Sequence, residues 1–468
     1  MFHVVRSSAV PLADQLVEEL SSLIESRRLA EGTRLPSIRL LARRAGVSAF
    51  TVTAAFEKLL ARGLIESRRG SGHFVAVRRE LKMPVEVELG PPVHADPGIH
   101  FAHSATDARD IRVPAGAGFL PASWYADAIP ASALSKMACS AATQGRAPSQ
   151  GDGALRELLA QRLHLEGVPA AAHNIVVTAG ASQAFDLIAR KLLAPGDTVL
   201  VDDPGYFVLP TQLKARGLQL VSVPRCPDGP DIGALEEAAR LHRPRMFFTQ
   251  TLVHNPTGVS ASPANCHAVL SLAEKHGFLV VEDHVYTDFA TSHRVSLAQI
   301  DELRRVLYVG SYSKILSPGM RVGFLAVAEA LVAPLIEAKI VSVLTGSALI
   351  ECVLREVLAS GTYRKHVQRL RDKLASARSR AVERLREAGL CIEHVPSDGM
   401  FLWARLPSPL DAEELAAHAR RTGILLAAGP MFSISGGSRD YLRFNSAYAA
   451  DPLLVSFLNE RRPLIAQG

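Results

Sequence analysis

Two serines, a lysine and an arginine follow one apolar run, and their chemistry suits a phosphorylated aldehyde. The run 306–309 predicts a buried strand, and Ser311, Ser313, Lys314 and Arg321 come after it. A lysine amine can form a Schiff base with an aldehyde cofactor, while hydroxyls and a guanidinium can grip its phosphate. By itself, a lysine after a strand is more often a solvated surface residue. The interpretation therefore depends on matching fragments elsewhere in the chain.

Three further fragments carry groups that a flat, phosphorylated ring requires. The segment 178–184, TAGASQA, leads into a predicted helix, where the N–H groups of Ala181 and Ser182 and the Ser182 hydroxyl form a phosphate cradle. Tyr206 can stack on the ring, and Asn255 in HNPTG offers an amide donor to a ring hydroxyl oxygen. Each fragment alone also has a plainer explanation: a capped helix, a core tyrosine and a simple turn.

An aspartate and a tyrosine stand at the end of another apolar run. Asp283 ends the run 279–283, LVVED, where a carboxylate is costly to bury unless it has a cationic partner. A protonated pyridine nitrogen is such a partner, and this pairing makes the cofactor an electron sink. Tyr286, three residues later, would reach the ring oxygen.

Strand-like and helix-like runs alternate through this part of the chain. Strands are expected at 175–177, 199–201, 246–248, 279–282 and 306–309, with a helix at 182–193. The alternation predicts an α/β domain with a largely parallel sheet flanked by helices. Ligands of such sheets bind beyond the carboxyl ends of the strands, and each candidate residue follows one of these runs.

Taken in order, these fragments resemble the signature of fold-type-I pyridoxal-phosphate enzymes, the aspartate-aminotransferase-like group. The resemblance implies catalytic roles for Lys314, Asp283 and Tyr286, with pyridoxal 5'-phosphate as cofactor. It also implies a smaller C-terminal α+β lobe. In that lobe Arg443 lies where the family holds a substrate carboxylate. The alternative for Arg443 is an exposed arginine on a strand, without a role in binding. The implied cofactor-binding residues are Ala181, Ser182, Tyr206, Asn255, Asp283, Tyr286, Ser311, Ser313, Lys314 and Arg321.

One part of the family pattern is missing. These families often show a Tyr-x-Asp-Pro-x-Gly segment before a Leu-Arg pair, and its tyrosine reaches the cofactor phosphate of a neighbouring subunit. Here the residues before Leu155 and Arg156 read GRAPSQGDGA, without a tyrosine. This departure argues against efficient catalysis more than against cofactor binding.

The first eighty residues have the pattern of a DNA-binding head. Apolar residues recur with a helical period over residues 11–29, and Ser37 and Ser48 can cap two further helices joined by a glycine-containing turn. The second helix of such a unit, expected at about 49–62, is built to enter a major groove. Residues 63–76 read as two short strands around a glycine-rich tip, which predicts a basic wing.

This stretch resembles the winged helix of GntR-type bacterial regulators, whose pattern includes L-P-S-x-R-x-L-A, G-V-S and G-S-G-x-F-V. The resemblance implies double-stranded DNA as a partner and arginines on its phosphates, although any one arginine is also explained as a solvated charge. Such regulators often carry arginine just after the G-V-S serine, whereas Ala49 and Phe50 stand here, which favours backbone contact over base readout. The candidate DNA-binding residues are Arg34, Ser37, Arg39, Arg43, Arg44, Ser48, Thr51, Thr53, Arg68, Arg69 and Ser71.

The composition limits the class of protein and suggests its division. The 468 residues, 48% hydrophobic and 21% charged with net charge +6, are typical of a soluble protein of two or more domains. We expect a winged helix at 1–78, an extended linker at 79–113 and an aminotransferase-like body at 114–468, with its small lobe from about 331. Five scattered cysteines without a C-x-x-C pair predict neither disulfides nor a metal site. Without a signal-like start or an 18-residue apolar run, we expect a cytoplasmic protein.

A winged helix joined through a long linker to an aminotransferase-like body resembles the MocR subfamily of GntR regulators. The resemblance implies that Lys314 holds pyridoxal phosphate as an internal aldimine, onto which an amino compound with a carboxylate, or a B6 vitamer, exchanges. Closure of the small lobe would then reach the heads of a homodimer on paired DNA half-sites. The main hypothesis is a transcription regulator that uses its cofactor as a sensor. The alternative is an active aminotransferase, for amino acids and 2-oxo acids, with an accessory head.

Overall fold

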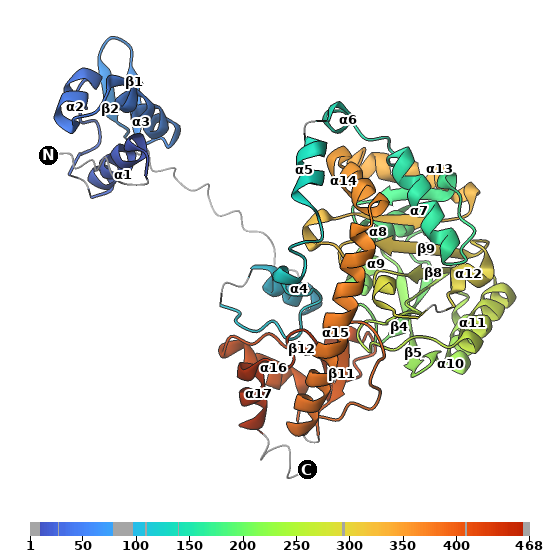
Figure 1. Cartoon of the computed structure of the whole chain (residues 1–468). Helices are drawn as coiled ribbons and strands as arrows, with labels where there is room; N and C mark the ends of the chain where they lie inside the picture. The colour runs from blue at the N-terminus through green and yellow to red at the C-terminus, as the bar shows by residue number, and fades with distance from the viewer. Residues whose placement is uncertain are drawn as a thin grey trace. The chain divides into compact units, whose positions relative to one another are not determined.

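The computed structural model describes residues 10–26, 28–77, 97–107, 110–138, 140–292, 295–407 and 410–461. The chain divides into two compact units, residues 1–93 and 94–468, each of which is described by itself (Figure 1). Within the described ranges, no helix is both long and apolar enough to cross a membrane.

The N-terminal unit is a winged helix-turn-helix domain. Its elements are α1 (Leu12–Glu25), α2 (Ile38–Ala45), α3 (Ala49–Ala61), β1 (Ile65–Arg68) and β2 (Gly72–Val75). Ser37 and Ser48 cap α2 and α3 through their hydroxyl oxygens, and Gly46 ends α2 in the left-handed region with φ 65°. The two strands pair antiparallel, and the buried faces of the three helices form one apolar core beneath them. The predicted head is confirmed.

The large lobe of the second unit is built on an eight-stranded mixed sheet, with the order β3-β10-β9-β8-β7-β4-β5-β6. The strands are β3 (Ile175–Thr178), β4 (Thr198–Asp203), β5 (Gln219–Cys226), β6 (Gly229–Pro230), β7 (Met246–Thr249), β8 (Leu279–Asp283), β9 (Val306–Ser311) and β10 (Gly323–Ala326). Strands β9, β8, β7, β4 and β5 run parallel, whereas β10 runs antiparallel to both β3 and β9. The predicted largely parallel α/β sheet is confirmed, with β5, β6 and β10 as strands that were not expected.

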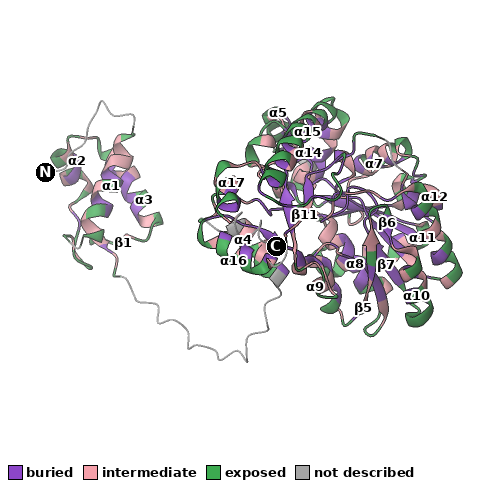
Figure 2. Cartoon of the chain, turned by 90° about the horizontal axis from the view of Figure 1, so that it is seen from below, coloured by how far each residue is buried: buried purple, intermediate pink, exposed green. Residues whose placement is uncertain are grey.

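Helices cover both faces of this sheet. Helices α8 (Ala181–Leu192), α9 (Val208–Lys214) and α13 (Glu329–Val343) bury one face. The other face packs against α7 (Gly153–Leu165), α10 (Ile232–His242), α11 (Pro263–His276), α12 (Leu297–Asp301) and α14 (Ala348–Ala359). Along β4, Val199 and Val201 enter the first core and Leu200 the second, because successive strand residues point to opposite faces. Figure 2 shows the buried strands between helices whose outer faces are exposed.

The small lobe is a three-stranded antiparallel sheet packed against helices. Its elements are β11 (Phe401–Arg405), β12 (Ala427–Ala428), β13 (Tyr441–Asn445), α15 (Thr362–Glu387), α16 (Ala412–Arg421) and α17 (Pro452–Asn459). Val113 and Ala115 also lie in this core, and the Gly116 N–H donates to the Leu425 carbonyl at 2.7 Å. The segment that begins the body at the expected boundary therefore lies along the small lobe before the chain enters the large one.

The expected linker falls mostly outside the described residues, but its C-terminal part forms a helix. Residues Pro97–Asp107 make α4 rather than extended chain. Phe101 packs edge-on against Phe207, with ring centroids 5.8 Å apart. Proline suits the first turn of a helix, and the contact with Phe207 gives this one an apolar surface to cover, so this part of the predicted linker belongs to the body.

Candidate cofactor and effector site

The predicted site residues lie at the carboxyl ends of four neighbouring strands. Asp283 ends β8, and Lys314, Asn255 and Tyr206 follow β9, β7 and β4. Because these strands are parallel neighbours, their carboxyl ends meet at one edge of the sheet. Residues separated by more than a hundred positions in the sequence are thereby brought into one site.

The Lys314 amine lies in a partly buried position between a backbone carbonyl and an aromatic ring. Its Nζ donates to the Gly118 carbonyl oxygen at 2.9 Å and lies 3.5 Å from the centre of the Phe119 ring. Desolvation, helped by the positive charges of Arg443 and Arg321, lowers the pKa of Lys314 to about 7. A large fraction of the Lys314 amine is therefore neutral and nucleophilic near neutral pH, as covalent attachment to an aldehyde requires.

Asp283 is a buried carboxylate with little local compensation. The Val285 N–H donates to its Oδ1 at 3.0 Å. Burial raises the pKa of Asp283 to about 6, against the lowering effects of that bond and of the His284 and Lys314 charges. A cation placed against this carboxylate would restore its ionised form, and a protonated pyridine nitrogen meets that need.

Tyr286 forms one wall of the same site. Its ring centre lies 5.8 Å from the Lys314 Nζ. The ring packs edge-on against the Phe401 ring, with the two ring centres 5.3 Å apart. Burial raises the pKa of the Tyr286 phenol, so it remains a protonated donor at neutral pH.

The N-terminus of α8 has the features of an anion-binding site. The helix starts after Gly180, at φ 80°, and no side chain caps it, which leaves the cradle of Ala181 and Ser182 available to a phosphate. The Arg321 guanidinium lies beside it, with Nη2 donating to the Ala179 carbonyl at 3.3 Å. A Cβ added at Gly180 would come within 3.2 Å of the same Nη2, so the glycine admits the guanidinium.

The two serines before Lys314 occupy different environments. The Ser311 hydroxyl donates to the Val322 carbonyl at 3.3 Å and accepts from the Ser313 N–H at 3.3 Å. The Ser313 hydroxyl is buried and has no hydrogen-bond partner in the described part of the chain. A phosphate oxygen would give this buried hydroxyl a partner, whereas the Ser311 hydroxyl is already engaged.

Arg443, on β13 of the small lobe, is held by groups of both lobes. Its side chain is fully buried, with Nη1 donating to Asn255 Oδ1 at 2.6 Å and Nη2 to the Gly116 carbonyl at 2.5 Å. The guanidinium carbon lies 4.3 Å and 4.8 Å from the ring centres of Phe401 and Phe432. Burial lowers the pKa of Arg443 to about 10, so it keeps its charge at neutral pH and can pair with a carboxylate.

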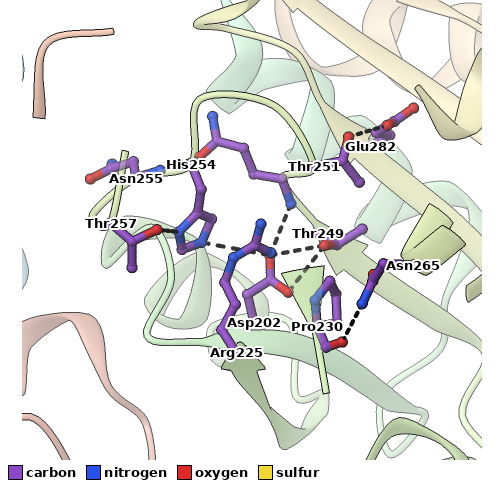
Figure 3. Close-up of polar contacts among 11 residues, drawn as sticks. Asp202, Arg225, Pro230, Thr249, Thr251, His254, Asn255, Thr257, Asn265 and Glu282 are labelled. Carbon is purple, nitrogen blue, oxygen red and sulfur yellow. Dashed lines mark hydrogen bonds and ion pairs between the residues drawn. The ribbon is translucent and has the colours of Figure 1, made fainter. Parts of the chain in front are cut away.

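A buried polar network holds the loop that carries Asn255 (Figure 3). The Gln250 side-chain oxygen accepts from the Asn255 N–H at 2.7 Å, and the Gln250 N–H donates to Asp202 at 2.9 Å. Asp202 also receives Arg225 Nη1 at 3.0 Å and the Thr249 hydroxyl at 2.9 Å. Because each partner is buried, the network fixes the loop that carries Asn255, which in turn positions Arg443.

Sequence reasoning missed the segment that faces Lys314. Gly118 and Phe119 contact its amine, and the Tyr125 hydroxyl donates to the Lys314 backbone carbonyl at 3.0 Å. The available signal was the run of small residues at 115–118. A Cβ at Gly116 would lie 2.4 Å from the Ala427 nitrogen, so a glycine is needed for this close approach.

In the head, all six of the predicted phosphate-contacting arginines are exposed. Arg34, Arg39, Arg43, Arg44 and Arg69 point to solvent. Arg68 is instead held by Glu66, with Nη2 2.6 Å from Oε1, and lies over the Phe74 ring at 4.4 Å. Because Glu66 already pairs with Arg68, the other five arginines are the better placed to meet a nucleic-acid backbone.

The predicted DNA-binding hydroxyls are mostly engaged within the head. Ser37 accepts from the Leu40 N–H at 3.3 Å, and Ser48 accepts from the Thr51 N–H at 3.0 Å. Thr53 donates to the Ala49 carbonyl at 3.0 Å. Ser71 lies exposed at the tip of the wing.

The pKa values of Lys314 and Asp283 predict how cofactor uptake depends on pH. Attachment needs neutral Lys314, which is lost as the pH falls below about 7. The ring nitrogen needs ionised Asp283, which is lost as the pH falls below about 6. We expect the rate of pyridoxal-phosphate uptake by the apoprotein to increase from pH 5 to 7 and to level off above pH 8. Stopped-flow absorbance measures this rate, and a profile that decreases between pH 5 and 8 would contradict the assignment.

Comparisons with known proteins agree with both halves of the chain. Residues 127–451 match the family model for aminotransferase class I and II, and residues 12–75 match that for bacterial regulatory proteins of the gntR family. The chain is 30% identical to an uncharacterised HTH-type transcriptional regulator, YdcR, of Escherichia coli K12, over 93% of this chain and 94% of that protein. It is 28% identical to the probable rhizopine catabolism regulatory protein MocR of Rhizobium meliloti, over 90% and 86%.

The body is also similar to enzymes. The chain is 31% identical to a 2-aminoadipate transaminase of Thermus thermophilus, over 64% of this chain and 76% of that one. The crystal structure of LysN, an alpha-aminoadipate aminotransferase of the same organism complexed with N-(5'-phosphopyridoxyl)-L-leucine, matches with TM-score 0.70 and 24% identity over 79% of this chain and 97% of that one. Class I and II aminotransferases depend on pyridoxal phosphate, so the predicted cofactor is confirmed at the level of the family. The chain belongs to the MocR-type regulators, with a GntR-family winged-helix head and a class I and II aminotransferase body.

Proposed function

We propose that this regulator binds DNA through its head and senses an amino compound that carries a carboxylate, or a B6 vitamer, through the cofactor site of its body. One observation supports the ligand class above all others. A Cβ added at Gly118 would lie 3.5 Å from Lys314 Nζ and 4.0 Å from Arg443 Nη2, so the amine and the guanidinium border the same small space. A ligand with an amino group at the cofactor and a carboxylate at Arg443 fits between them.

The residues of the site have separate tasks in this proposal. Pyridoxal phosphate, when bound, supplies an aldehyde that condenses with amines and a ring that withdraws electrons. Asp283 keeps the ring nitrogen protonated, Tyr206 stacks on the ring, and Arg321 with the N-terminus of α8 holds the phosphate. Lys314 provides the amine that an incoming amino compound displaces, and it can then carry a proton.

Arg443 offers a route from the ligand to the small lobe. It belongs to β13 of the small lobe, yet it donates to Asn255 of the large lobe and to the Gly116 carbonyl. A ligand carboxylate that competes with Asn255 for the guanidinium would change the contact that joins the two lobes. Ligand control needs such a contact, present in one state and absent in the other.

An active aminotransferase with an accessory head is the second candidate function. The cofactor-facing residues are present, and one relative is a transaminase. The missing tyrosine before Leu155 weighs against efficient turnover and for a sensor. We expect a cytoplasmic protein under both candidates. We also expect a homodimer, because a two-fold protein suits paired DNA half-sites.

Turnover and DNA binding separate the two candidates. Fluorescence anisotropy would measure affinity for DNA from upstream of the gene, with and without a panel of amino acids, amines and B6 vitamers. Coupled assays would follow conversion of amino acid and 2-oxo acid by the same preparation. Catalytic turnover without any DNA binding would refute the regulator, whereas ligand-dependent DNA affinity with little turnover is the expected result.

Replacing exposed arginines of the head should flatten the salt dependence of DNA binding. We expect Arg39→Ala with Arg69→Ala to weaken binding to all sequences and to reduce the slope of log affinity against log salt by about 1 for each phosphate that is no longer neutralised. Arg62→Ala removes one positive charge at the C-terminal end of α3 and serves as the control for the change of slope per charge. A change of slope per removed charge as large in the control as in the double variant would show that net charge alone is responsible.

A further inference from the structure

The outward face of α3 exposes a phenylalanine where a recognition helix meets DNA. The Phe50 side chain is 83% exposed in the first turn of α3, two residues after the Ser48 cap, while Val52 and Phe56 on the opposite face are buried. Ala49 beside it is also exposed, and Ala54 lies on the same side. A large apolar group left in water at this position has no role in the core of the head.

Polar side chains on this part of the helix are short and already bonded. Ser48 and Thr51 share a hydrogen bond of 2.8 Å between their hydroxyls, and Thr53 donates to the Ala49 carbonyl. The first long polar side chain along the helix is Glu57, whose negative charge opposes approach to a phosphate. Bidentate hydrogen bonding to a base edge, which takes a long polar side chain, is therefore not what the first turns of α3 offer.

The helix before Phe50 in the sequence carries exposed positive charges. Arg39, Arg43 and Arg44 of α2, just before the turn into α3, are all exposed. Such a surface attracts the DNA backbone and brings the first turn of α3 to the major groove. The one apolar group that base edges display there is the 5-methyl of thymine.

We propose that Phe50 recognises thymine through its 5-methyl group, so that each half-site of the operator carries a thymine opposite this side chain. The inference rests on the proposed DNA-binding function and deepens it by naming the chemical group that is read. Contact between ring and methyl removes apolar surface from water. Only an A·T pair provides that methyl, so the contact discriminates against the other bases.

Replacement of thymine by uracil tests this contact, because it removes only the methyl and keeps base pairing. The full chain loaded with pyridoxal phosphate would select duplexes from a random pool, and each thymine of the selected site would then be replaced in turn. At one position per half-site we expect about fourfold weaker binding, the effect of one buried methyl-sized group. Phe50→Ala should weaken binding about tenfold and bind the thymine and uracil duplexes equally well.

Leu165→Ala is the matched control, because Leu165 is also 83% exposed but lies on α7 of the body. It should keep both the affinity and the uracil effect of the native chain. If uracil is tolerated at every position, or costs the same in Phe50→Ala, the inference is wrong while DNA binding stands. If the native chain selects no duplex at all, the proposed function fails, and the inference fails with it.

Discussion

Lys314→Ala will yield a folded protein that no longer retains pyridoxal phosphate covalently or shows its near-ultraviolet and visible absorbance after gel filtration. The reason is chemical, because the Lys314 amine is the nucleophile aimed into the site, held by the Gly118 carbonyl at 2.9 Å and kept near a pKa of about 7. Alanine also removes a positive charge from beside Arg443 and Arg321, so the fold should not suffer from the change. We expect retained cofactor to fall at least tenfold, and the response of DNA affinity to any effector to disappear with it.

Attachment to other lysines must be separated from attachment at position 314. Borohydride reduction of the loaded protein, followed by peptide mapping, should place the cofactor on Lys314 in the native chain. Lys191→Ala, which removes an exposed lysine paired with Glu337 at 2.7 Å, should keep full absorbance. Retained absorbance in Lys314→Ala, with the label mapped to another lysine, would contradict the site as described.

Side-chain chemistry at strand ends was predictable from the sequence, whereas contacts through the backbone were not. Asp283, Lys314 and Asn255 each follow an apolar run, and a parallel sheet brings the ends of such runs to one edge. Gly116 and Gly118 contact Arg443 and Lys314 respectively through their carbonyl oxygens. Any residue type carries a carbonyl, so the run of small residues at 115–118 indicates only a close approach and not which groups the carbonyls bind.

Two elements show why parts of the fold escaped prediction. Strand β10 has four residues, starts at a glycine and pairs with β3, which lies more than a hundred residues earlier. Its pairing with strands on both sides is a tertiary feature, which no local pattern of residues shows. Helix α4 lies in a region of prolines and charges, and its contact with Phe207 becomes visible only when the body is folded.

The junction of the lobes is where structure adds most to the proposal. Arg443 was expected to hold a carboxylate, but its bond to Asn255 shows that the same guanidinium also joins the lobes, while its bond to Gly116 lies within the small lobe. The network of Asp202, Gln250 and Arg225 makes Asn255 a fixed partner. We therefore expect a ligand that competes for Arg443 to weaken its contact with the large lobe and to shift the small lobe.

Asp283→Asn should retain the cofactor yet slow removal of the α-hydrogen from a bound amino acid by roughly a hundredfold to a thousandfold. A carboxylate about 4 Å from a cation contributes about 4 kcal/mol at an effective dielectric constant of 20, which corresponds to about three powers of ten in rate at the upper limit. The neutral amide cannot hold the proton on the ring nitrogen, so the ring withdraws electrons less strongly. Exchange of the α-hydrogen into deuterated water measures the step whether or not the protein completes a catalytic cycle.

Asp203→Asn is a matched control for this change, since Asp203 also ends a strand at the same edge but accepts from the Ser435 N–H at 3.0 Å. It removes one carboxylate charge near the site without touching the position assigned to the ring nitrogen. We expect it to alter the exchange rate by less than about fivefold, because a charge farther from the ring acts through a higher effective dielectric constant. Equal exchange rates in Asp283→Asn and the native chain, with the cofactor bound in both, would contradict the role given to Asp283. A carboxylate that holds the proton on the ring nitrogen cannot be replaced by an amide without a decrease in this rate.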